Sequence, residues 1–354
     1  MTACAFVIPG DIGMLTGGYA YDRRVLALLP AHGIAVRHVA LPGSYPEPTE
    51  FDLQETARVL AALPADIVLL MDGLAYGAMP AETIARLQQR IVALVHHPLA
   101  LEAGLTQTRV QSLQQCEQTA LGLAKEVIAT SAMTARILER DFDVPMGKIA
   151  IAEPGTDRVA RARGTGTPVQ LLAVGSIVPR KGYDTLALAL HHLERAPDWH
   201  LTIVGAVRDE TARAALDQHL AAPEDMTGLP LGRRVTITGA VSDARLFELY
   251  DRADVFVMPS LYEGYGMVLA EALVRGLPIV CTTGVAAAHA LPTGTVVMIE
   301  PGDATALGSR LNDLVLSAPL RRRYADAAWS AGQVLPTWDD TARTIATVLK
   351  KVAA

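Results

Sequence analysis

The chain alternates short runs of β-branched and aliphatic residues with longer stretches of helical periodicity from one end to the other. This rhythm is typical of parallel sheets, because each parallel strand needs a crossover, usually a helix, before the next one. The pattern therefore predicts an α/β protein with two doubly wound, Rossmann-like parallel sheets. The expected strands lie at residues 5–9, 35–41, 66–72, 91–96, 126–131 and 148–152, and at residues 170–175, 200–205, 234–239, 253–258, 278–282 and 295–300.

Helical patterns fill the intervals and close the chain. They are expected at residues 19–31, 82–89, 112–124, 183–194, 210–220, 244–251, 267–275, 304–316, 321–331 and 337–350. The alternation breaks at residues 153–167, where glycine and proline gather, and such a composition indicates a linker. A chain of 354 residues is also too long for one hydrophobic core. We expect a first domain at 1–155, a linker at 156–168, a second domain at 169–335 and a closing helix at 336–354.

Charge and composition exclude several classes of protein. A formal net charge of −6 without a basic stripe gives no support to nucleic-acid binding. No apolar run reaches the roughly 20 residues that span a bilayer, and no basic amphipathic helix marks a membrane surface, although peripheral membrane contact stays open. The cysteines are far apart and form no paired motif, and no leader segment precedes the first strand, so we expect free thiols and a cytoplasmic protein. The three cysteines are Cys4, Cys116 and Cys281.

The segment after the expected strand 253–258 carries a carboxylate at each end of a glycine turn. It reads Glu263-Gly264-Tyr265-Gly266-Met267-Val268-Leu269-Ala270-Glu271. Gly264 and Gly266 let a ligand approach the backbone, and the amides of the helix start that follows suit a phosphate. The carboxylates accept hydrogen bonds from hydroxyl groups. This combination predicts a site for a sugar nucleotide.

A second loop of the same half places two cations together. It follows the strand at 170–175 and contains Ser176, Arg180 and Lys181. A solvated surface pair would explain these cations if they stood alone. Because this loop and the glutamate loop both follow strands of one predicted sheet, we expect Arg180 and Lys181 to neutralise a diphosphate. The Walker pattern is absent.

Other strand ends offer candidates with an alternative reading for each. The glycines Gly17 and Gly18 open a helix without matching G-x-G-x-x-G, so they indicate a phosphate or substrate approach or else a mobile loop. His96 follows a strand, and it either contacts a substrate or forms a structural pair with His97. No further His, Cys or carboxylate stands at the spacing of metal ligands, so a metal site is not indicated. Two further glycines, Gly205 and Gly239, offer exposed backbone to a nucleotide base or serve tight turns.

Together these residues resemble the GT-B glycosyltransferases of the large retaining family called glycosyl transferases group 1. The E-x7-E arrangement of Glu263 and Glu271 carries the resemblance, supported by Lys181-Gly182, Gly17-Gly18 and His96. The resemblance implies two domains facing a cleft, with the C-terminal helix crossing back to the first domain.

The resemblance also implies a role for each residue. Lys181 binds the donor diphosphate, Glu263 lies at the transferred sugar, Glu271 binds the ribose, and His96 touches the sugar. Ser176 replaces the usual arginine of the family, with Arg180 as its substitute, and residues 282–289 lack the usual Pro-Glu segment. We count Glu263, His96, Arg180 and Lys181 as catalytic. The remaining donor-binding candidates are Gly17, Gly18, Ser176, Gly205, Gly239, Gly264, Tyr265, Gly266, Met267 and Glu271.

The implied reaction is transfer of a hexose from a nucleoside-diphosphate sugar to a hydroxyl group, with retained anomeric configuration and without a metal or other cofactor. The acceptor is a sugar, a small alcohol or a lipid headgroup, which places the enzyme in carbohydrate metabolism. Three alternatives stay open: a sugar-nucleotide epimerase, a phosphorylase, and a sugar-nucleotide-binding protein without catalytic activity.

Overall fold

The computed structural model describes residues 1–193, 198–221 and 231–354, which form two compact units. Unit 1 consists of Met1–Gly155 and Pro336–Ala354, and unit 2 consists of Thr156–Leu335. Each unit contains one six-stranded parallel sheet, so the predicted fold class is confirmed. All twelve predicted strands are present, most of them one or two residues shorter or shifted at an end.

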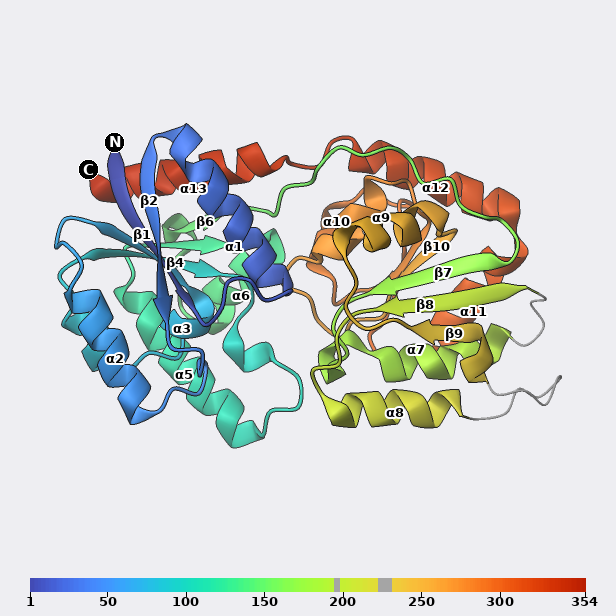
Figure 1. The fold of residues 1–354 in the computed structure, drawn as a ribbon, viewed down its shortest axis with the longest axis horizontal. Helices are drawn as coiled ribbons and strands as arrows, with labels where there is room; N and C mark the ends of the chain where they lie inside the picture. Colours follow the sequence, from blue (N-terminus) through green and yellow to red (C-terminus); the bar gives the residue numbers. More distant parts are fainter. Residues whose placement is uncertain (194–197, 222–230) are drawn as a thin grey trace. The chain divides into compact units, whose positions relative to one another are not determined.

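The sheet of unit 1 has the strand order β2-β1-β3-β4-β5-β6. Its strands are β1 (Thr2–Pro9), β2 (Ile34–Leu41), β3 (Val68–Asp72), β4 (Arg90–Val95), β5 (Glu126–Ala129) and β6 (Ile149–Ile151). Helices α1 (Gly17–Leu28) and α13 (Trp338–Ala353) cover one face, and α2 (Glu50–Ala61), α5 (Gln107–Leu123) and α6 (Ala132–Asp141) cover the other (Figure 1). The sequence order reverses between β1 and β3, where doubly wound sheets bind ligands.

Two short helices follow β3, and one of them corrects a prediction. They are α3 (Gly73–Tyr76) and α4 (Ala81–Ala85). The helix predicted at 82–89 is wrong in its second half, because α4 ends at Ala85. Gln89 turns inward instead, where its side-chain amide donates to the carbonyls of Leu60 and Leu63 and the chain enters β4.

The sheet of unit 2 has the order β12-β11-β10-β7-β8-β9. Its strands are β7 (Val169–Val174), β8 (Trp199–Val204), β9 (Val235–Ile237), β10 (Val255–Met258), β11 (Ile279–Thr282) and β12 (Val297–Ile299). Helices α7 (Tyr183–Leu190), α8 (Glu210–Leu220) and α11 (Ala304–Leu316) pack on one face. Helices α9 (Asp243–Arg252), α10 (Met267–Leu273) and α12 (Ala318–Gly332) pack on the other. The predicted helix 183–194 is helical to Leu190 with a 3-10 turn to Leu193, and its last residue lies outside the described part.

Strand β10 shows why these strands read as apolar runs. Val255 and Val257 enter the core under α7 and α11, whereas Phe256 and Met258 enter the core under α9 and α10. A strand buried on both faces carries apolar residues at every position. The order of the sheet reverses between β7 and β10, which are direct neighbours.

The segment predicted as a linker is hydrogen bonded to unit 2 along part of its length. The backbone amides of Arg163 and Gly164 donate to the carbonyl oxygen of Asp251 at 3.0 and 2.9 Å. The hydroxyl of Thr165 donates to Asp254 at 3.0 Å. The segment therefore follows the surface of unit 2 before it enters β7.

Among the residues that the structure describes, no helix combines the length and the apolar character that crossing a membrane requires.

Candidate functional site

The reversal point of the second sheet brings the two predicted loops together. One loop follows β7 and contains Arg180 and Lys181, and the other follows β10 and contains Glu263. The backbone joins them as well, since the amide of Leu261 donates to the carbonyl oxygen of Arg180 at 2.8 Å. The expectation that both loops belong to one site of one sheet agrees with this geometry.

Glu263 forms ion pairs with both cations. Its Oε1 lies 2.6 Å from Lys181 Nζ and 3.1 Å from Arg180 Nη1. Arg180 also donates to the carbonyl oxygen of Tyr262 at 2.7 Å. All three charged side chains are less than one-fifth exposed. Sequence reasoning placed the cations on a diphosphate and the carboxylate on the sugar, but it did not foresee that they hold one another.

The electrostatics of Glu263 follow from this pairing. Burial alone would raise the pKa of the Glu263 carboxyl, but Lys181 and Arg180 outweigh burial and lower it to about 2. The carboxylate is therefore charged at neutral pH. A fixed anion between two cations holds both of them at the carboxyl ends of β7 and β10.

Glycines make the close approach of these loops possible. Gly182 has a φ of +66°, and a Cβ there would lie 2.3 Å from the carbonyl oxygen of Pro259. Gly266 precedes α10 with a φ of +102°, and a Cβ there would lie 2.8 Å from Val285 Cγ1. Packing thus requires glycine at both positions. Gly266 is also the residue before α10, whose first backbone amides, beginning at Met267, have no acceptor within the helix.

Glu271 has a different environment. It lies in α10, and its Oε2 accepts a hydrogen bond of 2.9 Å from the hydroxyl of Tyr250 in α9. Arg275 stacks its guanidinium 4.4 Å from the centroid of the Tyr250 ring. Burial raises the pKa of Glu271, and the hydrogen bond from Tyr250 offsets part of that rise. The two glutamates of the motif therefore differ in partner and in proton affinity.

The other candidates in unit 2 divide into two groups. A Cβ on Gly205 would lie 1.9 Å from the carbonyl oxygen of Gly175, so packing between strand ends already requires this glycine. A Cβ on Gly239 would meet no atom of the described residues within 4 Å, which leaves open space beside it. Ser176 and Tyr265 lie in the β7 and β10 loops, Ser176 partly exposed and Tyr265 buried. Gly264 is buried next to Glu263.

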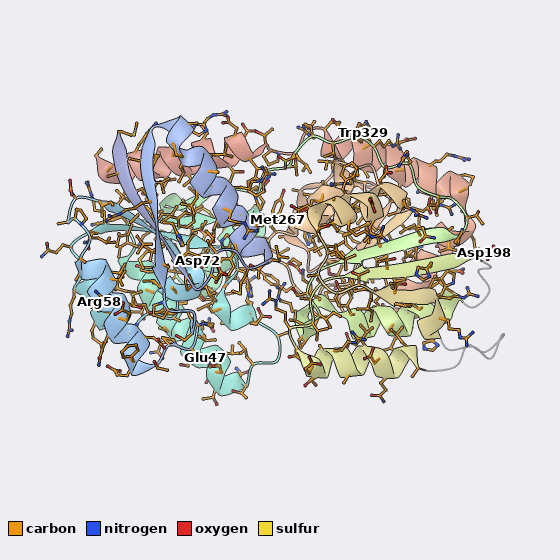
Figure 2. The ribbon with its side chains drawn as sticks, in the orientation of Figure 1. Glu47, Arg58, Asp72, Asp198, Met267 and Trp329 are labelled. Atoms are coloured by element: carbon orange, nitrogen blue, oxygen red, sulfur yellow. The ribbon has the colours of Figure 1, made fainter. Side chains whose placement is uncertain are left out.

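A second cluster lies in unit 1, at the reversal point of the first sheet. His96 directly follows β4, and its Nε2 lies 3.0 Å from Asp22 Oδ1 and 3.8 Å from Asp72 Oδ2. Asp22 comes from α1 and is fully buried. Asp72, which Figure 2 labels, ends β3 and is also buried. The ring of Tyr21 contacts the His96 ring edge-on, with centroids 5.1 Å apart.

The predicted Gly17-Gly18 helix start lies beside this histidine. Gly17 is the first residue of α1, and a Cβ on Gly18 would lie 3.5 Å from His96 Cδ2. Thus the glycine pair and His96, predicted separately, meet at one place. His97 turns to Glu102 instead, with its Nε2 at 3.2 Å from Glu102 Oε2.

Charge coupling controls the protonation of the cluster. Burial would lower the pKa of His96, but the charge of Asp22, its hydrogen bond and the charge of Asp72 raise it to about 9. Burial and the neighbouring Asp22 raise the pKa of Asp72 to about 7. The three residues could offer a metal ion ligand atoms within 4.8 Å of one another. A histidine must be neutral to bind a metal, and the raised pKa of His96 opposes that state.

Sequence reasoning missed three residues of these clusters. Asp72 had a readable signal, because it is a carboxylate at the end of an otherwise apolar strand. Asp22 and Tyr250 lie inside helices, where only the tertiary packing shows their role.

Comparisons with known proteins find similarity to glycosyltransferases. Residues 159–330 match the family model described as Glycosyl transferases group 1. The chain is 25% identical over 325 residues to the MMP alpha-(1->4)-mannosyltransferase of Mycolicibacterium hassiacum, covering 88% of this chain and 76% of the relative. Two further curated relatives are matched over 51% and 54% of their length.

Two solved structures show the same fold. Sucrose-phosphate synthase from Thermosynechococcus elongatus superposes with a TM-score of 0.81 at 18% identity, with 99% of both chains covered. HepE from Anabaena, solved with UDP and glucose, superposes with a TM-score of 0.76 at 16% identity, covering 99% of this chain and 100% of HepE.

Proposed function

We propose that this glycosyltransferase, which has the GT-B fold and carries a group 1 glycosyltransferase domain at residues 159–330, moves a hexose from a nucleoside-diphosphate sugar to a hydroxyl group. The observation that carries the proposal is the ion-paired cluster of Lys181, Arg180 and Glu263 at the reversal point of the second sheet. The presence of UDP and glucose in HepE and the mannosyltransferase relative support this donor class.

Lys181 and Arg180 provide the charge that the leaving group needs. When the sugar departs, negative charge builds on the terminal phosphate, and two cations fixed in advance stabilise it without reorganising. Glu263 keeps both cations at the strand ends until the donor enters and then lies at the sugar. Since two cations supply this stabilisation, we propose that the reaction needs no metal ion.

The proposed transfer balances as a single displacement on one face of the sugar. The bond between the anomeric carbon and the phosphate oxygen breaks, and its electron pair stays on the phosphate. The acceptor oxygen forms the new bond to the anomeric carbon, and its proton passes to the departing phosphate oxygen. The anomeric configuration is therefore retained.

In unit 2, Glu271 with Tyr250 offers hydrogen-bond acceptors for the ribose hydroxyls. In unit 1, His96, Gly18 and Asp72 form a polar surface that suits the hydroxyls of a sugar. The roles of Glu271 and His96 follow the resemblance, and Tyr250 and Asp72 are added from the contacts described above.

Calorimetry with UDP, GDP and ADP in the presence of EDTA tests the donor site. We expect one of the three to bind, and the corresponding sugar nucleotide to be turned over, with NMR showing a retained linkage. An inverted product would exclude the displacement written above. Release of an altered sugar nucleotide without an acceptor would indicate an epimerase, and binding without any turnover would indicate a non-catalytic protein.

A further inference from the structure

A cavity of about 400 Å³ opens beside the His96 cluster in unit 1. Its lining comes from the segments that follow three strands: Thr16 after β1, Leu74 after β3 and Leu99 after β4. This is the carboxyl edge of the sheet at its reversal point, where doubly wound sheets bind ligands. His96 and Gly18 belong to the lining, so a ligand in this cavity meets them.

Most of the cavity wall is apolar. Four leucines contribute to it, and Leu99 and Leu113 are themselves almost fully buried. Leu74 and Leu105 are partly buried and complete this side. Apolar walls with a few polar groups favour ligands that have an apolar part, because binding removes that part from water.

The histidines of the lining are already matched by carboxylates. His96 pairs with Asp22 and Asp72, and His97 pairs with Glu102. A phosphate group at either histidine would compete with these carboxylates and would lie beside them, which is a like-charge arrangement. Carboxylate oxygens do, however, accept hydrogen bonds from sugar hydroxyls.

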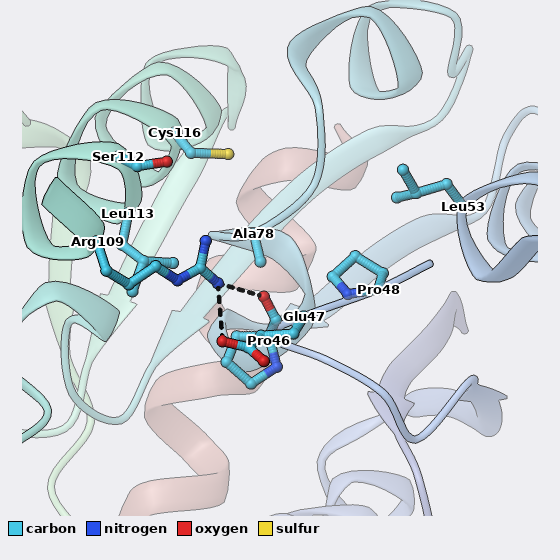
Figure 3. A pocket seen from close by; sticks show the side chains of 9 residues that line it. All are labelled: Pro46, Glu47, Pro48, Leu53, Ala78, Arg109, Ser112, Leu113 and Cys116. Carbon is cyan, nitrogen blue, oxygen red and sulfur yellow. Dashed lines mark hydrogen bonds and ion pairs between the residues drawn. The ribbon is translucent and has the colours of Figure 1, made fainter. Parts of the chain in front are cut away.

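The remaining cation of the lining is Arg109, and its Nη2 has two partners. It reaches from α5 to the carbonyl oxygen of Pro46 at 3.1 Å and lies 3.6 Å from Glu47 Oε1 (Figure 3). These residues and Leu113 also line a neighbouring cavity of about 520 Å³. The two cavities are therefore neighbours that share the wall formed by these residues.

We infer that the acceptor of this enzyme is an uncharged glycoside with an apolar aglycone, not a sugar phosphate. Its sugar ring lies against Asp72 and His96, and its aglycone runs along Leu105 and Leu113 towards the neighbouring cavity. The role of this ligand as acceptor rests on the proposed glycosyl transfer, whereas the binding preference follows from the cavity alone.

Calorimetry on the full chain tests the preference directly. The probes are octyl β-D-glucopyranoside and octyl α-D-mannopyranoside below their micelle concentrations, the free sugars, and the 6-phosphates of both sugars. We expect an octyl glycoside to bind at least about tenfold more tightly than its free sugar, because the chain enters apolar surroundings. The 6-phosphates should bind more weakly than the free sugars. A sugar phosphate that binds as tightly as the octyl glycoside, or the failure of both octyl glycosides to bind, would overturn the inference.

A pair of leucine variants locates the binding. Leu105→Asn should reduce octyl-glycoside affinity to that of the free sugar, whereas Leu101→Asn should leave it unchanged, since Leu101 is 36% exposed and outside the lining of both cavities. Equal losses in both variants would contradict the assignment.

Nucleotide binding by the same samples keeps the two proposals separate. A protein that binds octyl glycoside but no nucleotide counts against the proposed function, and one that binds nucleotide but prefers sugar phosphate counts against this inference.

Discussion

Glu263 and Glu271 lie in one short segment, yet their surroundings shift their pKa values in opposite directions. Ion pairs lower the pKa of Glu263 to about 2, whereas burial beside a neutral phenol raises that of Glu271. We therefore expect Glu263→Gln to lower turnover by about a hundredfold, since it releases two cations from their fixed positions. Glu271→Gln should instead weaken nucleotide binding, as measured by calorimetry. Glu248→Gln, an exposed glutamate of α9, is the control. Similar effects of the first two changes would mean that their roles are misassigned.

The Asp22–His96 pair makes unit 1 sensitive to alkaline pH. The pKa of His96 is raised from 6.5 to about 9, so its stabilising contribution is complete below pH 6.5 and is lost as the pH rises through about 9. The loss is about 3 kcal/mol of unfolding free energy. Asp22→Asn removes the main cause of the raised pKa and should abolish this decline, measured by denaturant unfolding at pH 6.5 and 9. The decline should persist in Asp66→Asn, an exposed aspartate. Its persistence in Asp22→Asn would contradict the pairing.

At the scale of elements, strands could be predicted from the sequence better than helix ends and helix-borne site residues. A strand such as β10 is buried on both faces, so its apolar run is visible without tertiary information. The proximity of the two loops that carry Lys181 and Glu263 was also predictable, because both follow strands of one sheet, but their ion pair was not. Beyond the end of α4, Gln89 donates hydrogen bonds to the carbonyls of Leu60 and Leu63. The role of Asp22 depends on its contact with His96, which follows β4. Neither contact leaves a local pattern.

The attachment of α13 to β6 depends on one glycine. A Cβ on Gly155 would lie 2.1 Å from the backbone nitrogen of Trp338, where α13 begins. Gly155→Ala should therefore lower the unfolding free energy of unit 1 by about 2 kcal/mol or more, because backbone has to move. Gly122→Ala is the matched control, since Gly122 lies in α5 with no atom of the described residues within 4 Å of the added carbon. It should raise stability by about 0.5 kcal/mol. Denaturant unfolding measures both changes. A shift of the unfolding free energy in the same direction in both variants would contradict the close contact between Gly155 and Trp338.

At the scale of the whole molecule, the two units have separate cores, but unit 1 is built from both ends of the chain. Trp338, Ile345 and Leu349 of α13 are buried, and Thr341 donates to the carbonyl oxygen of Glu153 at 2.7 Å. Each large apolar side chain contributes about 2 kcal/mol by burial, and the covered sheet face adds to this, whereas a domain is stable by only about 5–15 kcal/mol.

A chain ending at Leu335 should therefore unfold unit 1 and leave unit 2 folded. Hydrogen exchange measured by mass spectrometry should show β1, β3 and β4 exchanging freely, while β7 and β10 stay protected and nucleotide still binds. A chain ending at Lys350 is the control, because it keeps Trp338, Ile345 and Leu349 and should protect both sheets. Protection of β1 and β3 in the shorter chain would show that α13 is dispensable. Exchange of β7 together with β1 would show that the units do not fold independently.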